Sequence, residues 1–299
     1  MSGKDWLKFT LLGLIWGSSF LWIKIAVSEV SPFMLVSLRV LFALLGLLAL
    51  AGITRAFKGL VIPPRQWGWF VLLGFTNVVI PFMLISWAET RITSGVASIL
   101  NCTVPLFTIL IAPFFVPEDR LSLPRLLGLG LGFAGVVLLM SQNLGGAGGS
   151  LEGELAMLGG ALLYGISNVI ARLKTRGYSP AIQSLLQVGP AGAAMWLITP
   201  LADRPLVFPA QPLTWVALVW LGVMGSCIAN WLYFSLIHSV GPTRTGLVTY
   251  VFPLVGVILG AVFLGERPGW QALLGGLLII SGIAAVNLRW SGTKGKAST

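Results

Sequence analysis

The residues best suited to chemistry in this chain of 299 residues are polar side chains that lie inside long apolar runs. They are amides, hydroxyls and aromatic rings, namely Ser18, Trp22, Asn77, Asn101, Tyr164, Asn168, Asn230 and Tyr250. Burying such a group without a partner costs roughly 2–7 kcal/mol, so each must meet a neighbour, water or a solute. Amides and phenols both donate and accept hydrogen bonds, which suits the groups of a zwitterion. The set predicts a binding site for a small solute, although a hydrogen bond between helices explains each residue singly almost as well.

Two prolines, Pro105 and Pro253, lie within apolar runs just beyond Asn101 and Tyr250. Each proline removes a backbone N–H donor and frees a carbonyl on the preceding turn. A freed carbonyl is tolerated beside a hydrated cavity but not in lipid. The two prolines therefore predict hinge or cavity backbone, with a simple bend that serves helix packing as the alternative.

Arg39 stands out among the basic residues because it lies roughly 9 Å inside a helix that begins near Phe33. Its guanidinium could snorkel outward, cap a carbonyl or recognise an anionic group of a solute. The rings of Trp16, Trp87, Trp231 and Tyr233 could also line a route for solutes. Packing against neighbouring helices is the simpler explanation of these rings.

Groups that could perform catalysis or bind a metal are scarce. The chain has one histidine, and its two cysteines, Cys102 and Cys227, are expected to be buried small hydrophobic residues. The acidic residues fall at the ends of apolar runs or between them: Asp5, Glu29, Glu89, Glu118, Asp119, Glu152, Glu154, Asp203 and Glu266. A relay for protons or sodium ions would need a carboxylate near the centre of a run. We therefore expect no enzyme, no cofactor, no metal site and no buried acidic relay.

The composition places these residues in membrane helices. Only 9% of the residues are charged, 56% are hydrophobic, and the mean hydropathy is +0.92, which excludes an ordinary soluble domain. Runs of roughly 18 to 23 apolar residues match the length needed to cross about 30 Å of hydrocarbon. They show no alternation typical of a barrel strand, so the fold class is an all-α integral membrane protein.

Ten transmembrane helices are expected, and their connections differ in charge. We predict spans at 6–27, 33–53, 67–89, 92–115, 123–141, 153–173, 180–200, 213–236, 242–264 and 269–289. Alternate connections on one side carry Lys4, Lys8, Arg55, Lys58, Arg65, Arg120, Arg125, Arg172, Lys174, Arg176, Arg244, Arg289, Lys294 and Lys296. The other side carries Lys24, Arg91, Arg204 and Arg267. Basic residues gather on the cytoplasmic side of membrane proteins, so both termini are predicted to be cytoplasmic. Because the basic residues lie between apolar runs, the net charge of +10 does not indicate a nucleic-acid partner.

The sequence also repeats itself at an offset of 148 residues (165 − 17). The offset aligns Gly17 with Gly165, Ser31-Pro32 with Ser179-Pro180, Arg39 with Gln187, Gly74 with Gly222, Pro105-Leu106 with Pro253-Leu254, and Glu118 with Glu266; after a one-residue shift, Gly128 and Gly135 match Gly275 and Gly282. This predicts a first five-helix repeat over 1–144, a glycine-rich linker over 145–150, and a second repeat over 151–299 with a short basic tail. An odd number of spans per repeat gives the halves opposite orientations in the membrane.

Several short segments carry a resemblance to a known family. They are Leu14-Ile15-Trp16-Gly17-Ser18-Ser19-Phe20, Ser31-Pro32, Val104-Pro105-Leu106 and Glu118 in the first half, and Tyr164-Gly165, Ser179-Pro180, Phe252-Pro253-Leu254 and Gly265-Glu266 in the second. Through them residues 6–290 resemble the drug/metabolite transporter superfamily, in particular its bacterial ten-helix EamA-type exporters, and most of all amino-acid exporters of the YddG type. The resemblance implies that the first, third, fourth, sixth, eighth and ninth spans surround a central cavity.

The pattern and the resemblance together predict a secondary transporter of a bacterial inner membrane. We expect it to export amino acids or similar small metabolites by alternating access. An exporter of aromatic or cationic toxic compounds is the alternative, while a channel would show rings of charge or a carbonyl filter. The expected partners are the small-molecule substrate and the lipid bilayer, and the sequence leaves the oligomeric state open, a monomer included.

Overall fold

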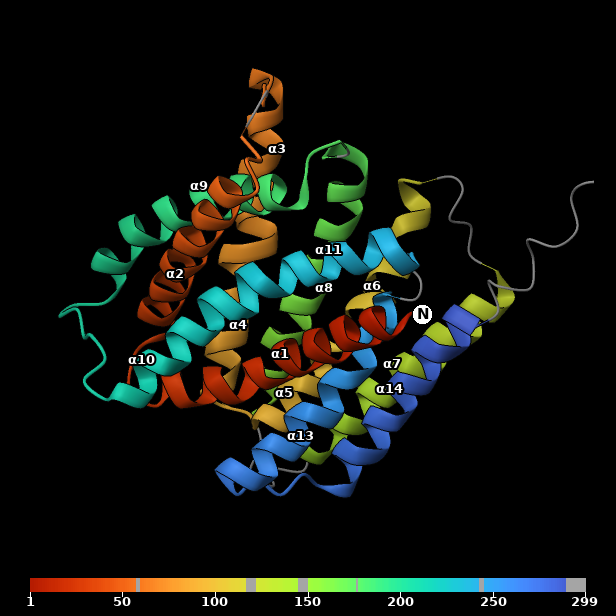
Figure 1. The fold of residues 1–299 in the computed structure, drawn as a ribbon. Helices are drawn as coiled ribbons and strands as arrows, with labels where there is room; N and C mark the ends of the chain where they lie inside the picture. Colours follow the sequence, from red (N-terminus) through yellow and green to blue (C-terminus); the bar gives the residue numbers. More distant parts are fainter. Residues whose placement is uncertain (58–59, 117–121, 145–149, 176, 242–244, 289–299) are drawn as a thin grey trace, which may run out of the picture.

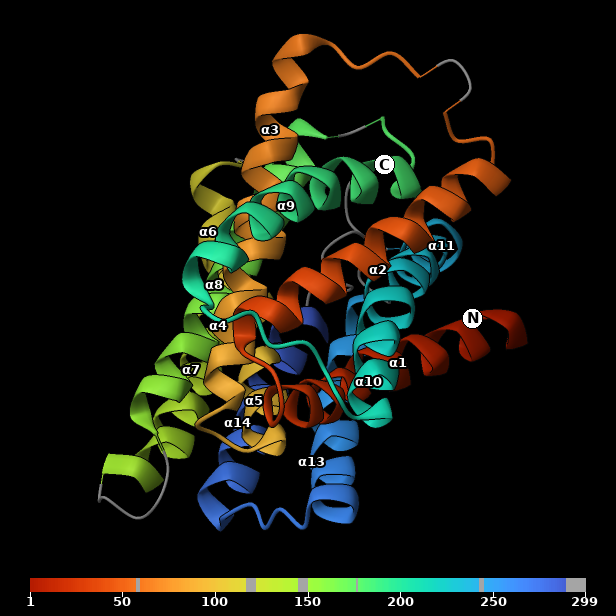
Figure 2. The same ribbon diagram turned by 90° about the vertical axis from the view of Figure 1, so that its left-hand side faces the viewer.

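Long helices that run in alternating directions make up the molecule, as Figures 1 and 2 show. A computed structural model describes residues 1–57, 60–116, 122–144, 150–175, 177–241 and 245–288. Six helices are continuous: α1 (Gly3–Val27), α2 (Pro32–Ile53), α7 (Leu123–Leu144), α8 (Leu151–Lys174), α9 (Pro180–Ala202) and α14 (Trp270–Leu288). Most of the predicted linker, the basic tail, Glu118 and the start of the predicted ninth span lie outside the described residues.

The other spans are interrupted. They consist of α3 (Pro64–Gly74), η1 (Phe75–Val79) and α4 (Ile80–Glu89); of α5 (Ser94–Asn101), α6 (Val104–Ile111) and η2 (Ala112–Phe114); of α10 (Pro212–Val219), η3 (Trp220–Ile228) and α11 (Ala229–Val240); and of η4 (Leu247–Tyr250) and α13 (Val251–Leu264). Eight helical segments of the described chain are long and apolar enough to cross a bilayer, and Arg125–Ser141 and Trp270–Val286 are shorter apolar helices. Eight and two give the ten predicted spans.

Three of the four interrupted spans have a proline beside the irregular segment. A proline has no N–H for the carbonyl four residues earlier, so Pro81 removes the α-helical donor for the carbonyl of Asn77, and Pro105 removes that for Asn101. The first position is in the π-helical segment η1, and the second precedes the break between α5 and α6. In the second half Pro253 does the same for Thr249, whose carbonyl accepts a hydrogen bond from Cys102 at 2.8 Å.

Glycine contacts show that the two halves are related by a two-fold axis. A Cβ on Gly135 would lie 2.6 Å from the carbonyl oxygen of Gly275, and one on Gly282 would lie 2.5 Å from that of Gly128. These contacts are images of each other under the repeat alignment, and they hold α7 against α14 (Figure 1). Two more mirrored pairs join the halves elsewhere: Gly74 on Gln187 with Gly222 on Arg39, and Gly17 on Val255 with Gly165 on Phe107. The fold is therefore the expected pair of inverted five-helix repeats.

The connections between helices lie at two ends of the bundle. We call the end with the start of α1 and residues 54–57, 60–63, 175 and 177–179 the terminal face. We call the end with residues 28–31, 90–93, 203–211 and 265–269 the far face. Two helices that begin at the far face have side-chain caps, since Ser31 and Thr93 accept hydrogen bonds from Met34 N and Val96 N. The capping fixes where α2 and α5 enter the membrane region.

Candidate functional site

A cavity of about 310 Å³ lies between the two halves. Side chains of α1, α2, α4, α5, α6, α8, α9, α11 and α13 line it, together with those of the irregular segments η1, η3 and η4. Neither α7 nor α14 supplies a lining residue. The resemblance implied six lining spans, and the structure adds the second and the seventh, α2 and α9. A volume of this size suits a small organic solute.

Most residues that line the cavity have a counterpart in the other half at the repeat offset, and that counterpart also lines the cavity. At the offset of 148 residues the lining residues form these pairs: Trp16 and Tyr164, Ser19 and Ser167, Phe20 and Asn168, Ile23 and Ala171, Arg39 and Gln187, Val40 and Val188, Asn77 and Gly225, Val78 and Ser226, Phe82 and Asn230, Ile85 and Tyr233, Asn101 and Thr249, and Val104 and Phe252. The unpaired lining residues are Ala43, Gln183 and Ser184. The two-fold axis therefore passes through the cavity.

Five of the eight predicted polar residues line this cavity: Asn77, Asn101, Tyr164, Asn168 and Asn230. Ser18, Trp22 and Tyr250 do not. The lining face of α1 is that of Ser19, one residue further on, and the lining hydroxyl of η4 belongs to Thr249. Whether the lining residues bind a solute stays a prediction.

The residues outside the lining serve helix packing. Ser18 accepts a hydrogen bond from Trp220 Nε1 at 3.2 Å and donates one to Ile15 O at 3.0 Å. The ring of Trp22 lies 5.8 Å from that of Trp220. Pro105 and Pro253 do not line the cavity either, but the carbonyls that lack an α-helical donor because of them belong to the lining residues Asn101 and Thr249. Of the aromatic residues considered, Trp16 and Tyr233 line the cavity, whereas Trp231 is 46% exposed.

Hydrogen bonds across the cavity hold several lining amides. Asn77 Nδ2 donates to Gln187 Oε1 at 3.0 Å, and Asn168 Nδ2 donates to Thr108 Oγ1 at 3.3 Å. Each bond joins one half to the other. Asn101 differs, because its Oδ1 is buried and has no partner among the described residues. A solute that donates a hydrogen bond would satisfy this oxygen.

Arg39 is the one cationic residue of the lining. Its side chain is 7% exposed, its Nε donates to Ser226 Oγ at 3.4 Å, and its guanidinium lies 3.7 Å from the ring centre of Phe82. No carboxylate of the described chain lies within 4.0 Å of it. Arg39 thus neither reaches the membrane surface nor caps a carbonyl, and two of its three nitrogens, Nη1 and Nη2, have no hydrogen-bond partner in the described chain.

The cavity can be entered from the terminal face. Its residues toward that face are solvent-accessible, with Asn168 exposed and Ala171 and Gln183 half-buried near the ends of α8 and α9. Its residues toward the far face are not, since Ile23 is 2% and Ile85 5% exposed. The structure is therefore open at one end and closed at the other.

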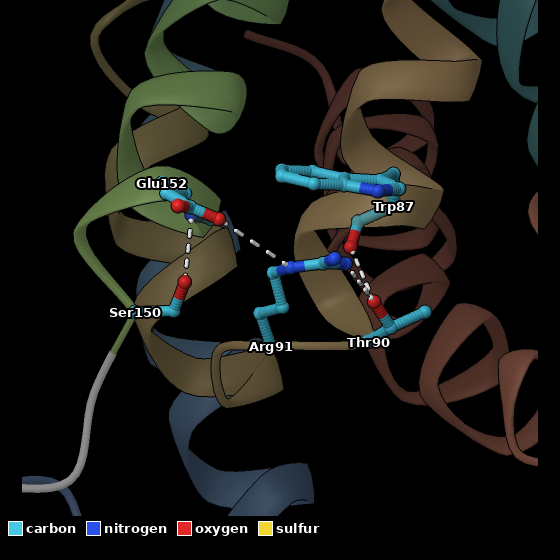
Figure 3. A network of polar contacts seen from close by, with 6 residues as sticks. Trp87, Thr90, Arg91, Ser150 and Glu152 are labelled. Atoms are coloured by element: carbon cyan, nitrogen blue, oxygen red, sulfur yellow. Dashed lines mark hydrogen bonds and ion pairs between the residues drawn. The ribbon is translucent and has the colours of Figure 1, made fainter.

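Polar contacts between the halves close the far face. Glu266 caps the start of α5 by accepting hydrogen bonds from Ser94 N at 2.8 Å, Ser94 Oγ at 2.9 Å and Gly95 N at 3.1 Å. Further links are Arg91 to Glu152 at 4.0 Å (Figure 3), Glu29 to the N–H groups of Ala210 and Gln211, and Ser31 to Asp203.

Glu89 is more buried than its position in the sequence suggests. It ends α4, as expected of an acid at a span end, yet it is 0% exposed and neither carboxylate oxygen has a hydrogen-bond partner in the described chain. Lys24 Nζ instead donates to the backbone oxygens of Glu89 at 2.5 Å and Ile92 at 2.7 Å. No sequence signal marks this burial, because an acid at the end of an apolar run ordinarily faces water.

Comparison with known proteins agrees with this architecture. The profile of the EamA-like transporter family matches the chain twice, over residues 6–141 and 151–288. A solved crystal structure has the same fold, with a TM-score of 0.69, 23% identity, and coverage of 97% of this chain and 98% of that chain.

Three curated relatives are transporters by name. The chain is 28% identical to an uncharacterised inner membrane transporter, YedA, of Escherichia coli K12, over 88% of this chain and 84% of that protein. It is 25% identical to a probable amino-acid metabolite efflux pump of the same organism, over 97% of both chains. It is 28% identical to a probable terminal-alkyne amino-acid exporter of Streptantibioticus cattleyicolor, over 76% of this chain and 75% of that protein.

Proposed function

The chain belongs to the EamA-like transporter family and is a multi-pass membrane transporter, and from that premise we propose that it exports amino acids or similar small metabolites across a bacterial inner membrane. The observation that carries the proposal is the cavity between the halves, which has amide, hydroxyl and arginine side chains among its apolar lining residues, is of small-molecule size, and is accessible from the terminal face. The excess of basic residues at that face supports its location in the cytoplasm, by the positive-inside rule. A solute would therefore enter the cavity from inside the cell.

The repeat supplies the transport mechanism. Two inverted halves that exchange conformations convert a structure open at one face into a structure open at the other. Because nearly every lining residue has a counterpart in the other half, this exchange keeps the same pairs of residues around the solute. Only the opening moves from the terminal face to the far face. The solute crosses while the site itself stays near the membrane centre.

Amides, hydroxyls and one arginine give the cavity its chemical character. These groups suit the carboxylate and ammonium of an amino acid, and the names of two relatives also refer to amino acids. Export of toxic cations is less well supported, because a cation would meet the positive charge of Arg39 and no carboxylate among the lining residues.

A counterflow experiment in liposomes tests the proposal. Liposomes that contain the purified protein and are loaded with unlabelled solute should accumulate labelled neutral, basic, acidic or aromatic amino acids. The uptake should be saturable, and the transported amino acids should compete with one another. Asn101→Ala removes the unpartnered cavity oxygen and should raise the half-saturation concentration about tenfold, which corresponds to the loss of about 1.4 kcal/mol from one hydrogen bond.

The matched control is Ser141→Ala, which removes an exposed hydroxyl on α7 outside the cavity and should leave the transport kinetics unchanged. Ohmic current in place of saturable flux, or no flux of any amino acid, would contradict the proposal.

A further inference from the structure

We infer that Arg39 binds a carboxylate of the transported solute, so that the cavity accepts solutes with a carboxylate and rejects cations that lack one. The inference rests on the proposed function, since it assumes that the cavity is the transport site. It adds a substrate class and a residue that determines specificity. Its basis is a buried cation with free donors in a cavity that has no acidic residue.

The geometry of Arg39 leaves the two terminal nitrogens of its guanidinium, Nη1 and Nη2, available as hydrogen-bond donors. Only Nε is engaged, through a long hydrogen bond of 3.4 Å to Ser226 Oγ, and the face of the guanidinium is supported by the ring of Phe82. A planar guanidinium held at its face and at Nε presents Nη1 and Nη2 at its edge. Two parallel N–H groups match the two oxygens of a carboxylate. Phe82 and Ser226 thus hold the side chain in place for such a partner.

The charges of the lining favour an anion. Its residues include no aspartate, glutamate, lysine or histidine, so the single formal charge is that of Arg39. Glu89 is a buried acid of α4, but it does not line the cavity and forms no ion pair with Arg39. A solute carboxylate would therefore be the direct counter-ion, and an ammonium alone would find only neutral acceptors.

The repeat shows that Arg39 is a chemical difference between two otherwise equivalent positions. Gln187 occupies the matching place in α9, and both backbones have the same surroundings, since Gly222 packs on the carbonyl of Arg39 and Gly74 on that of Gln187. Gln187 is already engaged with Asn77 across the cavity. Helix packing is therefore satisfied by a neutral residue in one half and does not explain the buried charge in the other.

Three probes that share a phenylethyl group test the inference. They are phenylalanine, 3-phenylpropanoate, which lacks the ammonium, and phenethylamine, which lacks the carboxylate. We measure their binding to the full-length protein in lipid nanodiscs. Both carboxylates should bind at least tenfold more tightly than the amine. Equal affinities, or no binding by either carboxylate, would overturn the inference without any need for a variant.

Variants then locate the preference. Arg39→Gln introduces the residue found at the matching position of the other half and should reduce the ratio of carboxylate to amine affinity to near one. Arg39→Lys keeps the charge but not the two parallel N–H donors, so it should retain part of the preference for carboxylates. Arg91→Gln is the matched control, because Arg91 also lies 3.7 Å from a ring centre, that of Trp87, but outside the cavity (Figure 3). An unchanged ratio in Arg39→Gln would assign the preference to another residue and refute the inference.

The outcome is separable from that of the proposed function. Absence of saturable flux in liposomes together with carboxylate binding that depends on Arg39 would contradict transport but not the carboxylate site. Saturable flux of amino acids that phenethylamine inhibits as strongly as 3-phenylpropanoate would leave transport standing and contradict the carboxylate site.

Discussion

At the scale of single residues, Glu29 shows how one side chain can join the two halves. It lies in the connection between α1 and α2, outside the spans, and its Oε1 accepts hydrogen bonds from Ala210 N at 2.6 Å and Gln211 N at 2.9 Å. Interaction with the hydroxyl of Thr214 and these two backbone donors lower the pKa of Glu29 below its ordinary value. The ionised form is the one that holds the start of α10 to the first half.

This pKa shift predicts a pH dependence of stability. Because the pKa of Glu29 is lower in the folded protein, its contribution is fully present above the ordinary glutamate pKa of about 4.3 and is lost as the pH falls through the folded value. Glu29→Gln should therefore lower the melting temperature at pH 7, and the difference from the unsubstituted protein should shrink as the pH approaches 3. A difference that is constant with pH would contradict this role of the ionised carboxylate.

Sequence patterns could identify many site residues but not the direction in which each points. Ser18 and Trp22 are predicted site residues of α1, whereas Ser19 and Phe20 line the cavity, because the hydrophobic periodicity that would orient this largely apolar helix is weak. Arg39 was conspicuous as a buried charge, yet its free donors and its contact with Phe82 depend on η3 and α4. Such contacts join residues far apart in the sequence.

At the scale of helices, the tight pair of α7 and α14 (Figure 1) depends on glycines that have no room for a side chain. The backbone atoms of one helix lie where a Cβ of the other would be, as at Gly135, where a Cβ would lie 2.6 Å from Gly275 O and 2.8 Å from Ile279 N. Small residues permit close approach of helices in membranes, where dispersion contacts replace the hydrophobic effect between helices. Neither helix lines the cavity, so the pair supports the structure from outside.

Gly135→Ala should therefore separate the two helices. The new methyl group meets backbone atoms that cannot move aside, and overpacking of this kind typically costs about 1–3 kcal/mol. The melting temperature in detergent or nanodiscs measures the loss. Gly130→Ala is the control on the same helix, where nothing lies within 4 Å of the added Cβ, and it should be neutral or slightly stabilising. Equal melting temperatures of the two variants would contradict the importance of the close approach.

The sequence predicts helices better than it predicts their interruptions. Apolar runs of membrane-spanning length located all ten spans within a few residues, because the thickness of the bilayer fixes the length of a span. The π-helical segments η1 and η3 were not expected, since only Pro81 marks the first and no proline follows within η3. The lining role of α2 and α9 was also missed, because most of their residues are apolar and give no polar signal.

At the scale of the whole molecule, the two ends of the cavity differ in their contacts. The far face is closed by several links between the halves, of which the carboxylate of Glu266 on the start of α5 is the most extensive in the described chain. A carboxylate at a helix start satisfies backbone N–H groups that otherwise lack partners and interacts with the helix dipole. The energy of this cap favours the state that is open at the terminal face.

Glu266→Gln should shift the molecule toward the state that is open at the far face. Loss of the charged cap removes about 1 kcal/mol, which changes the ratio of the two states about fivefold. A cysteine introduced at the lining residue Ser184 reports the shift through its rate of reaction with membrane-impermeant thiol reagents in oriented vesicles. The rate from the side of the terminal face should fall and the rate from the opposite side should rise.

Ser141→Cys, on the exposed side of α7, is the control probe and should react alike in both backgrounds. The native Cys102 and Cys227 are buried and contribute little signal. Unchanged rates at Ser184→Cys would mean that the cap does not contribute to the balance between the two states.

The paired wall of the cavity has a consequence for how a solute is oriented. Several pairs combine an apolar residue of the first half with a polar residue of the second, as in Phe20 with Asn168 and Phe82 with Asn230. Had the duplicated halves stayed identical, a molecule rotated by half a turn would have the same energy, and it would tumble between two poses. Divergence of the two halves removes this degeneracy. A bound solute therefore keeps the same side toward the apolar residues of the first half from uptake to release.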